Sequence, residues 1–302
     1  MSIRSHPHSP TIFFFLIITS LCIGCQPVFT PLEESTLQIT ATVLLAAAPA
    51  EQELSPNEDG AETQTFCEES GTIQTLSLAS ELLNDVLEFN VYFPPCYRTD
   101  SEEPYPVIYL LHGQWQNAAL WQKIGIQAAA DDLILNRQRQ PFLIVMPTEE
   151  YYFRSAENNR YPDALLQELL PWVEENLQAC TQKECRAIGG ISRGAAWATR
   201  LVFQNPDVFG ALGAHSIPLF DGDIEILPAW VNAIPQDELP RIYADVGSSD
   251  PAVKDASAFE QELNALGVVH EWHLNSGRHN EDYWAQQLPN YLAWYTLAWL
   301  EE

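Results

Sequence analysis

Positive charge is scarce in this chain of 302 residues. Lysine and arginine together number 14, against 41 aspartates and glutamates, which gives a formal net charge of −27 at pH 7. Binding to a phosphate backbone needs clustered positive charge, so this composition excludes nucleic acid as a partner. Charged residues make up only 18% of the chain and hydrophobic residues 46%, which excludes global disorder and supplies a sizeable core.

The N-terminal apolar run is too short to span a bilayer comfortably. Residues 11–24 follow Arg4 and have the length of the hydrophobic region of a signal peptide. The run ends at Gly24-Cys25, which resembles the lipobox of bacterial lipoproteins, although Cys22 stands where leucine is usual. We expect residues 1–25 to be a lipoprotein-like signal peptide, and Cys25 to be lipidated and to anchor the exported protein at the membrane of a bacterial cell envelope. Ordinary secretion and an uncleaved anchor are the alternatives.

Basic residues are absent from residues 26–64, where Thr, Ala, Pro and Glu dominate. This composition predicts an acidic flexible tether, although residues 37–48 are apolar enough to form a strand or a short helix. The catalytic domain is expected over residues 65–302.

Beyond residue 25 the cysteines lack the CxxC spacing of a four-thiolate metal site, so we expect no metal there. Four remain after removal of the signal peptide and lipidation of Cys25: Cys67, Cys96, Cys180 and Cys185. An even number in an oxidising compartment favours two disulfides, for which three connectivities are possible. Pairing of neighbours along the chain closes the shorter loops.

Apolar runs and helical patterns alternate from residue 65 onwards. Such alternation predicts an α/β fold whose mostly parallel central sheet is covered by helices on both faces. Strands are expected at 86–93, 107–111, 142–146, 186–191, 211–215, 242–246 and 268–274. Helices are expected at 164–177, 195–203, 256–266 and 283–300, and one is expected to end within 131–139.

The motif Gly190-Ile191-Ser192-Arg193-Gly194 follows a short apolar strand and opens a helix. This is the context of a nucleophile elbow, in which a tight turn exposes the serine hydroxyl. A serine hydroxyl is a weak nucleophile and needs a neighbouring base. We therefore predict Ser192 as a catalytic nucleophile.

A histidine and an acid are expected after the serine in the chain. His279 lies in a loop between the last strand and the last helix, where sites of parallel sheets form, and is the predicted base. Asp250 lies in the loop that leaves the strand at 242–246 and is the predicted acid. Asp245, inside that strand, is the alternative, whereas Asp255 fits a helix start better.

Backbone N–H groups are the expected donors to the oxyanion. One belongs to Arg193, directly after the nucleophile, and the other to Gln114, where Gly113 lets the chain turn. Trp115 and Trp197 lie near these loops in sequence and are candidates to line an aryl or sugar pocket, with core packing as the alternative.

Five segments occur in a characteristic order: YLLHG at 109–113, ELLPWV at 168–173, GISRG at 190–194, DVGSSD at 245–250 and GRHN at 277–280. Together they resemble an esterase family of α/β-hydrolases that includes esterase D, feruloyl esterase modules, enterochelin esterases and mycolyltransferases. The resemblance covers residues 80–300 and implies the α/β-hydrolase fold, with the same roles for Ser192, Asp250, His279, Gln114 and Arg193. Arg278 departs from the family pattern, because many members have glycine there.

The expected function is that of a serine carboxylesterase that hydrolyses a small-molecule or sugar ester through an acyl-enzyme, with no metal or organic cofactor. An acyltransferase to a sugar or lipid alcohol would use the same triad. A non-catalytic surface protein on a hydrolase scaffold is a third reading, which the complete set of triad residues argues against.

Overall fold

A computed structural model describes residues 67–300 of the chain. The predicted signal peptide over 1–25, its lipidated Cys25 and the tether over 26–64 lie outside the described residues. Residues 67–300 belong to one compact unit that spans Glu62–Glu302.

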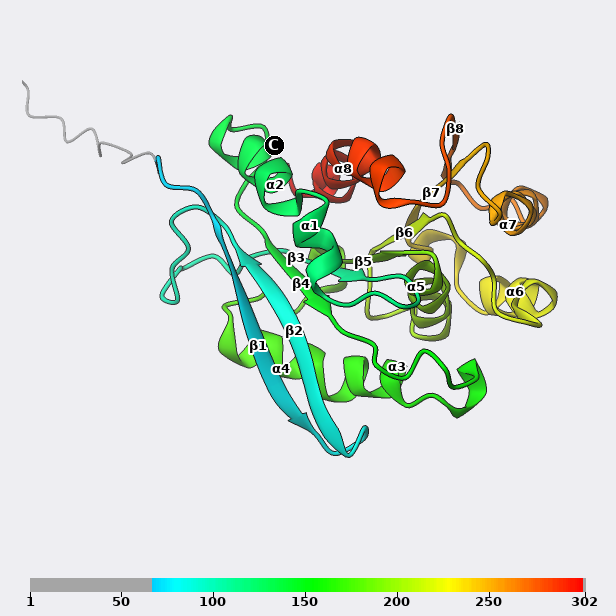
Figure 1. Ribbon diagram of the computed structural model, residues 1–302, viewed down its shortest axis with the longest axis horizontal. Helices are drawn as coiled ribbons and strands as arrows, with labels where there is room; N and C mark the ends of the chain where they lie inside the picture. Colours follow the sequence, from blue (N-terminus) through cyan, green and yellow to red (C-terminus); the bar gives the residue numbers. More distant parts are fainter. Residues whose placement is uncertain (1–66, 301–302) are drawn as a thin grey trace, which may run out of the picture. The chain divides into compact units, whose positions relative to one another are not determined.

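The unit is built around an eight-stranded sheet with the strand order β1-β2-β4-β3-β5-β6-β7-β8. The first two strands, β1 and β2, form an antiparallel hairpin, and β2 also pairs antiparallel with β4, whereas the remaining neighbours pair in parallel (Figure 1). The strands are β1 (Thr72–Ser80), β2 (Asp85–Phe93), β3 (Val107–Leu111), β4 (Leu143–Pro147), β5 (Arg186–Ile191), β6 (Ala211–His215), β7 (Arg241–Gly247) and β8 (Glu271–Asn275).

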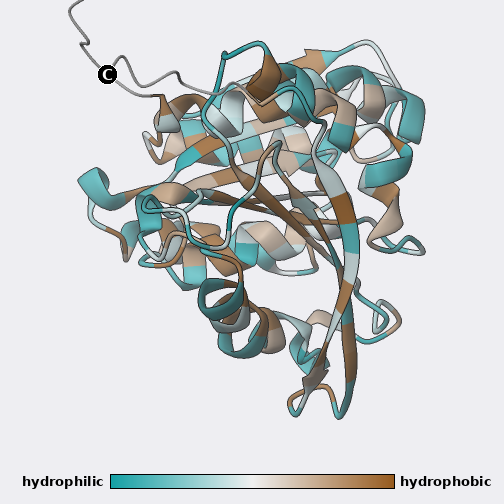
Figure 2. Ribbon diagram, turned by 90° about the vertical axis from the view of Figure 1, so that its left-hand side faces the viewer, coloured by the Kyte–Doolittle hydropathy of each residue, from teal (hydrophilic) through white to brown (hydrophobic). Residues whose placement is uncertain are grey.

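Two hydrophobic clusters lie on the two faces of the sheet. One cluster contains side chains of α1 (Ala119–Lys123), α2 (Ile126–Leu135) and α8 (Glu281–Tyr295). The other contains side chains of α3 (Tyr161–Ala164), α4 (Leu170–Asn176), α5 (Arg193–Gln204), α6 (Asp223–Asn232) and α7 (Val253–Ala265). The central strands are accordingly buried along their length and mostly apolar, as Figure 2 shows, because both of their faces are covered. This arrangement confirms the predicted α/β-hydrolase fold.

Short helical turns complete the described chain. They are η1 (Ala156–Asn158), η2 (Leu165–Leu169), η3 (Lys183–Cys185), η4 (Gln236–Glu238) and η5 (Thr296–Trp299). The helix predicted over 164–177 is interrupted, because η2 is a π-helical turn between α3 and α4. Pro171, at the start of α4, has no N–H for the helical ladder, which accounts for the irregularity.

Two disulfides join cysteines that are neighbours along the chain. Cys67 pairs with Cys96, and Cys180 with Cys185, with Cα–Cα distances of 5.8 and 6.1 Å. Both distances lie in the usual range for a disulfide. The four cysteines predicted to pair are therefore bonded, in the connectivity that closes the shorter loops.

Candidate active site

Ser192 lies on a sharp turn between β5 and α5. Its backbone has φ 56° and ψ −124°, outside the regions that non-glycine residues prefer. A Cβ at Gly190 would lie 2.5 Å from the Gly194 carbonyl carbon, and one at Gly194 would lie 2.4 Å from the Leu111 carbonyl oxygen. The turn therefore closes only with glycine at both positions, which is how the local sequence exposes the serine hydroxyl.

The Ser192 hydroxyl is the first member of a hydrogen-bonded chain. It lies 2.9 Å from Nε2 of His279, and Nδ1 of the same ring lies 2.9 and 3.0 Å from the two carboxylate oxygens of Asp250. A carboxylate only accepts, so Nδ1 carries the proton and Nε2 is the acceptor for the serine hydroxyl. The structure thus brings together all three residues that the sequence predicts as catalytic.

Asp250 is buried, at 2% exposure, in the loop after β7. Burial by itself raises the pKa of this carboxyl, but hydrogen bonds from His279, the Ala252 N–H and Ser216 outweigh it and hold the pKa below its usual value. Asp250 is therefore ionised when it faces His279.

The His279 loop is held by close packing on both sides. A Cβ at Gly247 would lie 2.5 Å from the carbonyl carbon of Gly277, and one at Gly277 would lie 2.2 Å from the Tyr283 ring. The Asn280 side chain accepts from the Tyr283 N–H and caps α8, the next helix. The imidazole also packs edge-on against Trp284, with ring centroids 5.1 Å apart.

Asp245, the alternative acid, has other partners. Its Oδ1 lies 2.7 Å from Nδ1 of His215, and its Oδ2 accepts from the hydroxyls of Tyr283 and Tyr291. His215 and Asp245 are fully buried at 0% exposure. This second His–Asp pair ties β6 and β7 to α8, and it uses the carboxylate that would otherwise compete for His279.

The loop after β3 is fixed by His112. The Glu149 N–H donates to Nε2 of His112, so Nδ1 carries the proton and donates to the Gly113 carbonyl at 2.7 Å. Burial lowers the pKa of His112, which favours this neutral form. In a trans peptide the C=O and the following N–H point in opposite directions. The bond from His112 to the Gly113 carbonyl therefore sets the direction of the Gln114 N–H.

Glu149 is a functional candidate that sequence reasoning missed. Its carboxylate, 3% exposed, accepts from Arg193 Nε at 2.9 Å, Arg193 Nη2 at 2.8 Å, Asn159 at 2.8 Å and Trp197 Nε1 at 3.0 Å. Arg193 is the first residue of α5, and the first N–H groups of a helix have no partner within it. The same residue thus offers a backbone donor beside Ser192 and a side chain fastened to Glu149.

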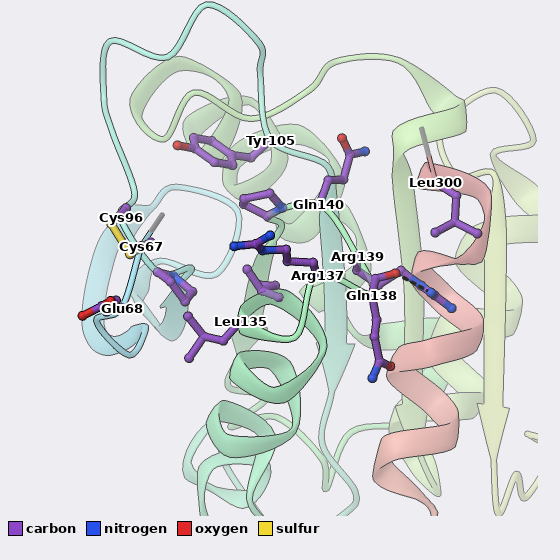
Figure 3. Close-up of a pocket in the computed structure, with 13 residues that line it drawn as sticks. Cys67, Glu68, Cys96, Tyr105, Leu135, Arg137, Gln138, Arg139, Gln140 and Leu300 are labelled. Carbon is purple, nitrogen blue, oxygen red and sulfur yellow. Dashed lines mark hydrogen bonds between the residues drawn. A yellow bond between two sulfur atoms is a disulfide. The ribbon is translucent and has the colours of Figure 1, made fainter. Parts of the chain in front are cut away.

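A cavity of about 320 Å³ adjoins the hydrogen-bonded chain. It is lined by Gly113, Gln114, Gln116, Ser192, His279, Asn280, Glu281 and Trp284. A larger hollow of about 810 Å³ lies near the Cys67–Cys96 disulfide and Tyr105 (Figure 3). That hollow lies at the amino-terminal ends of β3 and β4, whereas ligands of such sheets bind at the carboxyl ends, so the smaller cavity is the candidate site.

The two predicted pocket tryptophans lie in different surroundings. Trp115 is 74% exposed in the loop after β3. Trp197 is 2% exposed, its indole N–H donates to Glu149, and its ring packs on Phe220 at 4.6 Å. The prediction that Trp197 lines the pocket is therefore wrong for this structure, because the ring is buried in the core behind Arg193.

Within residues 67–300, no group of three or more His, Cys, Asp or Glu side chains is placed to hold a metal ion. The helices of this described part of the chain include none with the length and apolar character needed to cross a membrane.

A family model described as "Putative esterase" matches residues 80–295, which is more than half of the chain. The chain belongs to this esterase family. It shares the fold of feruloyl esterases and S-formylglutathione hydrolases.

Among curated relatives, the chain is 30% identical over 156 residues to an endo-1,4-beta-xylanase/feruloyl esterase of Xylanibacter ruminicola. That match covers 48% of this chain and 22% of the relative, so the chain resembles only a part of that longer protein.

Two solved structures show the same fold. A feruloyl esterase module from Clostridium thermocellum complexed with sinapinate has a TM-score of 0.67 at 19% identity, covering 78% of this chain and 92% of the module. An S-formylglutathione hydrolase from Staphylococcus aureus has a TM-score of 0.64 at 18% identity, covering 76% of this chain and 99% of the hydrolase.

Proposed function

We propose that the esterase cleaves a carboxylic ester through an acyl-enzyme on Ser192. His279 accepts the proton of the serine hydroxyl as the hydroxyl oxygen attacks the ester carbonyl, and then returns it to the leaving alcohol. Asp250 keeps the imidazole in the required tautomer and stabilises its protonated form. Water then attacks the acyl-enzyme with His279 again as the base, which releases the acid and restores the serine.

The oxyanion formed in each step needs donors that are fixed before the reaction. We assign these to the backbone N–H groups of Gln114 and Arg193. The support is that Gln114 lines the same cavity as Ser192, and that the His112 bond orients its peptide group. Arg193 follows the nucleophile directly and begins α5.

The observation that carries this proposal is the chain of hydrogen bonds from Ser192 through His279 to Asp250, all between 2.9 and 3.0 Å. A fluorophosphonate probe tests it by labelling an activated serine. We expect labelling of the native protein and none of Ser192→Ala, with a loss in kcat on the order of 10⁴ or more. The matched control Ser77→Ala changes an exposed serine on the edge strand β1 and should be labelled like the native protein. Equal labelling of all three proteins would overturn the assignment.

The substrate class is proposed from chemistry and from relatives together. The relatives named above include feruloyl esterases, so methyl ferulate is the first substrate to test, beside short and long acyl esters. Product analysis in the presence of sugar or lipid alcohols separates hydrolysis from acyl transfer on the same serine.

We also propose that the protein is exported and that Cys25 is its lipidated N-terminus. The support is the apolar run that ends at Gly24-Cys25. A lipid modification with several acyl chains would hold the protein at a membrane surface. Cys25→Ser should move the protein from the membrane to the soluble fraction, and unchanged membrane association would show that the anchor lies elsewhere.

A further inference from the structure

An exposed group of aromatic rings lies beside the candidate site. Trp115 and Phe153 are 74% and 71% exposed, and they are the only exposed Trp or Phe side chains among residues 67–300. Tyr152, which is only partly exposed, links them: its ring lies 4.5 Å from Trp115 and 6.0 Å from Phe153, centroid to centroid. We call these three residues the aromatic platform. A contiguous patch of aromatic rings that reaches the protein surface is typical of a binding surface.

The backbone conformation of Trp115 also indicates a binding function for the platform. Trp115 has φ 68°, in the left-handed region that a bulky side chain rarely adopts. The residues on either side, Gln114 and Gln116, line the cavity next to Ser192, whereas the Trp115 ring does not. The loop thus places Gln114 and Gln116 against the cavity and leaves the Trp115 indole exposed beside it. Strain of this kind, kept for a ring that is not buried, indicates a function other than packing.

The second half of the platform is attached to the nucleophile elbow through Arg193. The Arg193 guanidinium bonds to the Glu149 carboxylate at one end of the loop after β4 and to the Arg154 carbonyl, at 3.4 Å, at the other. Tyr152 and Phe153 lie between these two attachment points. A loop attached at both ends presents its rings at a lower ordering cost on binding.

The shape of the cavity and of the platform, together with the charge of the protein, indicates which class of ligand each of them binds. The open cavity of about 320 Å³ beside Ser192 has the size for an aryl acyl group. An exposed row of rings instead suits an extended ligand with flat apolar faces and polar edges, and a pyranose ring has this character. Polyanionic glycans are disfavoured because the protein has a net charge of −27.

We infer that the aromatic platform of Trp115, Tyr152 and Phe153 binds a neutral oligosaccharide, by stacking on sugar rings, and thereby holds the alcohol part of an ester at Ser192. The inference rests on the proposed esterase function. It assigns the acyl group to the cavity and the sugar to the platform, so the preferred substrate is an ester carried on a neutral glycan.

Binding is tested without turnover, in full-length Ser192→Ala protein. Hexasaccharides of xylose, glucose and mannose are titrated against it while tryptophan fluorescence is followed, with oligogalacturonate as the anionic comparison. We expect at least one neutral hexasaccharide to bind, and Phe153→Ala or Trp115→Ala to weaken that binding tenfold or more. Phe153→Tyr, which keeps the ring, should retain it, and the exposed control Val269→Ala should have no effect. Absence of binding by every neutral hexasaccharide would overturn the inference.

Kinetics with the active enzyme provide a second test of the inference. Methyl ferulate and a feruloylated neutral oligosaccharide share the acyl group and differ only in the alcohol. Phe153→Ala should lower kcat/KM for the oligosaccharide ester at least tenfold more than for methyl ferulate. Equal losses on both esters, a larger loss on methyl ferulate or no loss on either would overturn the inference. Failure of the esterase proposal would show instead as absent fluorophosphonate labelling, which leaves the binding experiment unaffected.

Discussion

Replacement of Glu149 by glutamine tests whether a buried carboxylate supports the nucleophile elbow. The glutamine side chain has the size of glutamate and keeps one acceptor oxygen, but it carries no charge. Its NH₂ group replaces the other oxygen and faces N–H donors, from which it cannot accept hydrogen bonds. Those donors are the Arg193 guanidinium, Trp197 Nε1 and Asn159 Nδ2, all within 3.0 Å of the carboxylate. The Arg193 side chain is 11% exposed, so water cannot readily replace the lost partner.

The size of the effect follows from the burial of both ions. Removing one partner of a buried ion pair costs about 3–5 kcal/mol, because the other charge is left uncompensated. The amide oxygen of the substituted side chain would retain part of the hydrogen bonding, so for Glu149→Gln we expect the lower end, about 3 kcal/mol of unfolding free energy. Displacement of Arg193 also disturbs the N–H beside Ser192. The loss of one oxyanion donor costs roughly 10²–10³ in kcat, which is the upper limit of the expected rate effect.

Urea denaturation of the native protein and of Glu149→Gln measures the change in unfolding free energy. The kcat of each protein on a simple ester measures the effect of the substitution on the active site. The double variant Glu149→Leu with Arg193→Met removes both charges and should recover much of the stability, since no buried ion is left alone. Asp100→Asn is the control, because the Arg98–Asp100 pair lies on the surface and should contribute nothing measurable. A loss below about 1 kcal/mol for Glu149→Gln would refute the reasoning, because a single neutral hydrogen bond accounts for that much.

Three further predictions concern the acid, the oxyanion loop and the disulfides. Asp250→Asn should lower kcat by a factor of roughly 10³–10⁴ with little loss of stability. Asp245→Asn should mainly lower the midpoint of urea denaturation. The reverse pattern would show that the acid is misassigned. Burial lowers the pKa of His112, so its contribution to stability is complete above the unfolded value of about 6.5 and is lost as pH falls below it. His112→Gln should therefore reduce the slope of unfolding free energy between pH 7.5 and 5.5, by at most about 1.4 kcal/mol per pH unit, and equal slopes would contradict this. Cys67→Ser opens a loop of sequence separation 29 and should lower the unfolding free energy by about 3–4 kcal/mol. Cys180→Ser opens a loop of separation 5 and should lower it by about 2 kcal/mol. Equal losses of unfolding free energy in denaturation would exclude loop entropy as the cause.

The central strands could be predicted because each is a short apolar run covered on both faces. The structure gives β3, β5 and β6 the bounds expected from the sequence, 107–111, 186–191 and 211–215. The edge strand β1 escapes prediction, since most of its residues are partly or fully exposed and its apolar signal is weak. The last strand, β8, begins at Glu271 instead of residue 268, after a turn in which Gly267 has φ 71°.

The predicted catalytic residues could be found because each follows a parallel strand, and all such strand ends meet at one edge of the sheet. Glu149 follows β4 in the same way, yet nothing in its neighbourhood marks it. Its partner Arg193 lies 44 residues away, after a strand that is not adjacent to β4 in the sheet. Contacts between loops of this kind depend on the lengths and paths of both loops, which neither periodicity nor a motif encodes.

The same difficulty explains the error at Trp197. Its place on α5, in the helix that Ser192 precedes, puts it near the nucleophile in sequence, but the helix turns its side chain inward. There its indole N–H needs an acceptor, and Glu149 supplies it. Trp115, by contrast, is exposed although it also lies close to a predicted site residue. Proximity along the chain therefore identified the correct region for both tryptophans. Only the direction of each side chain distinguishes Trp197, which packs in the core, from Trp115, which is a candidate for binding.

Arg193 connects the parts of this site that are far apart in sequence. Its backbone begins α5 beside Ser192, while its guanidinium holds Glu149 and the Arg154 carbonyl, and so fixes the loop that carries Tyr152. The backbone N–H of Glu149 in turn holds His112, which orients the oxyanion loop. One buried arginine thus couples the proposed nucleophile, the proposed oxyanion donors and the aromatic platform. A change that frees its side chain should therefore disturb both the proposed chemistry and the proposed glycan binding.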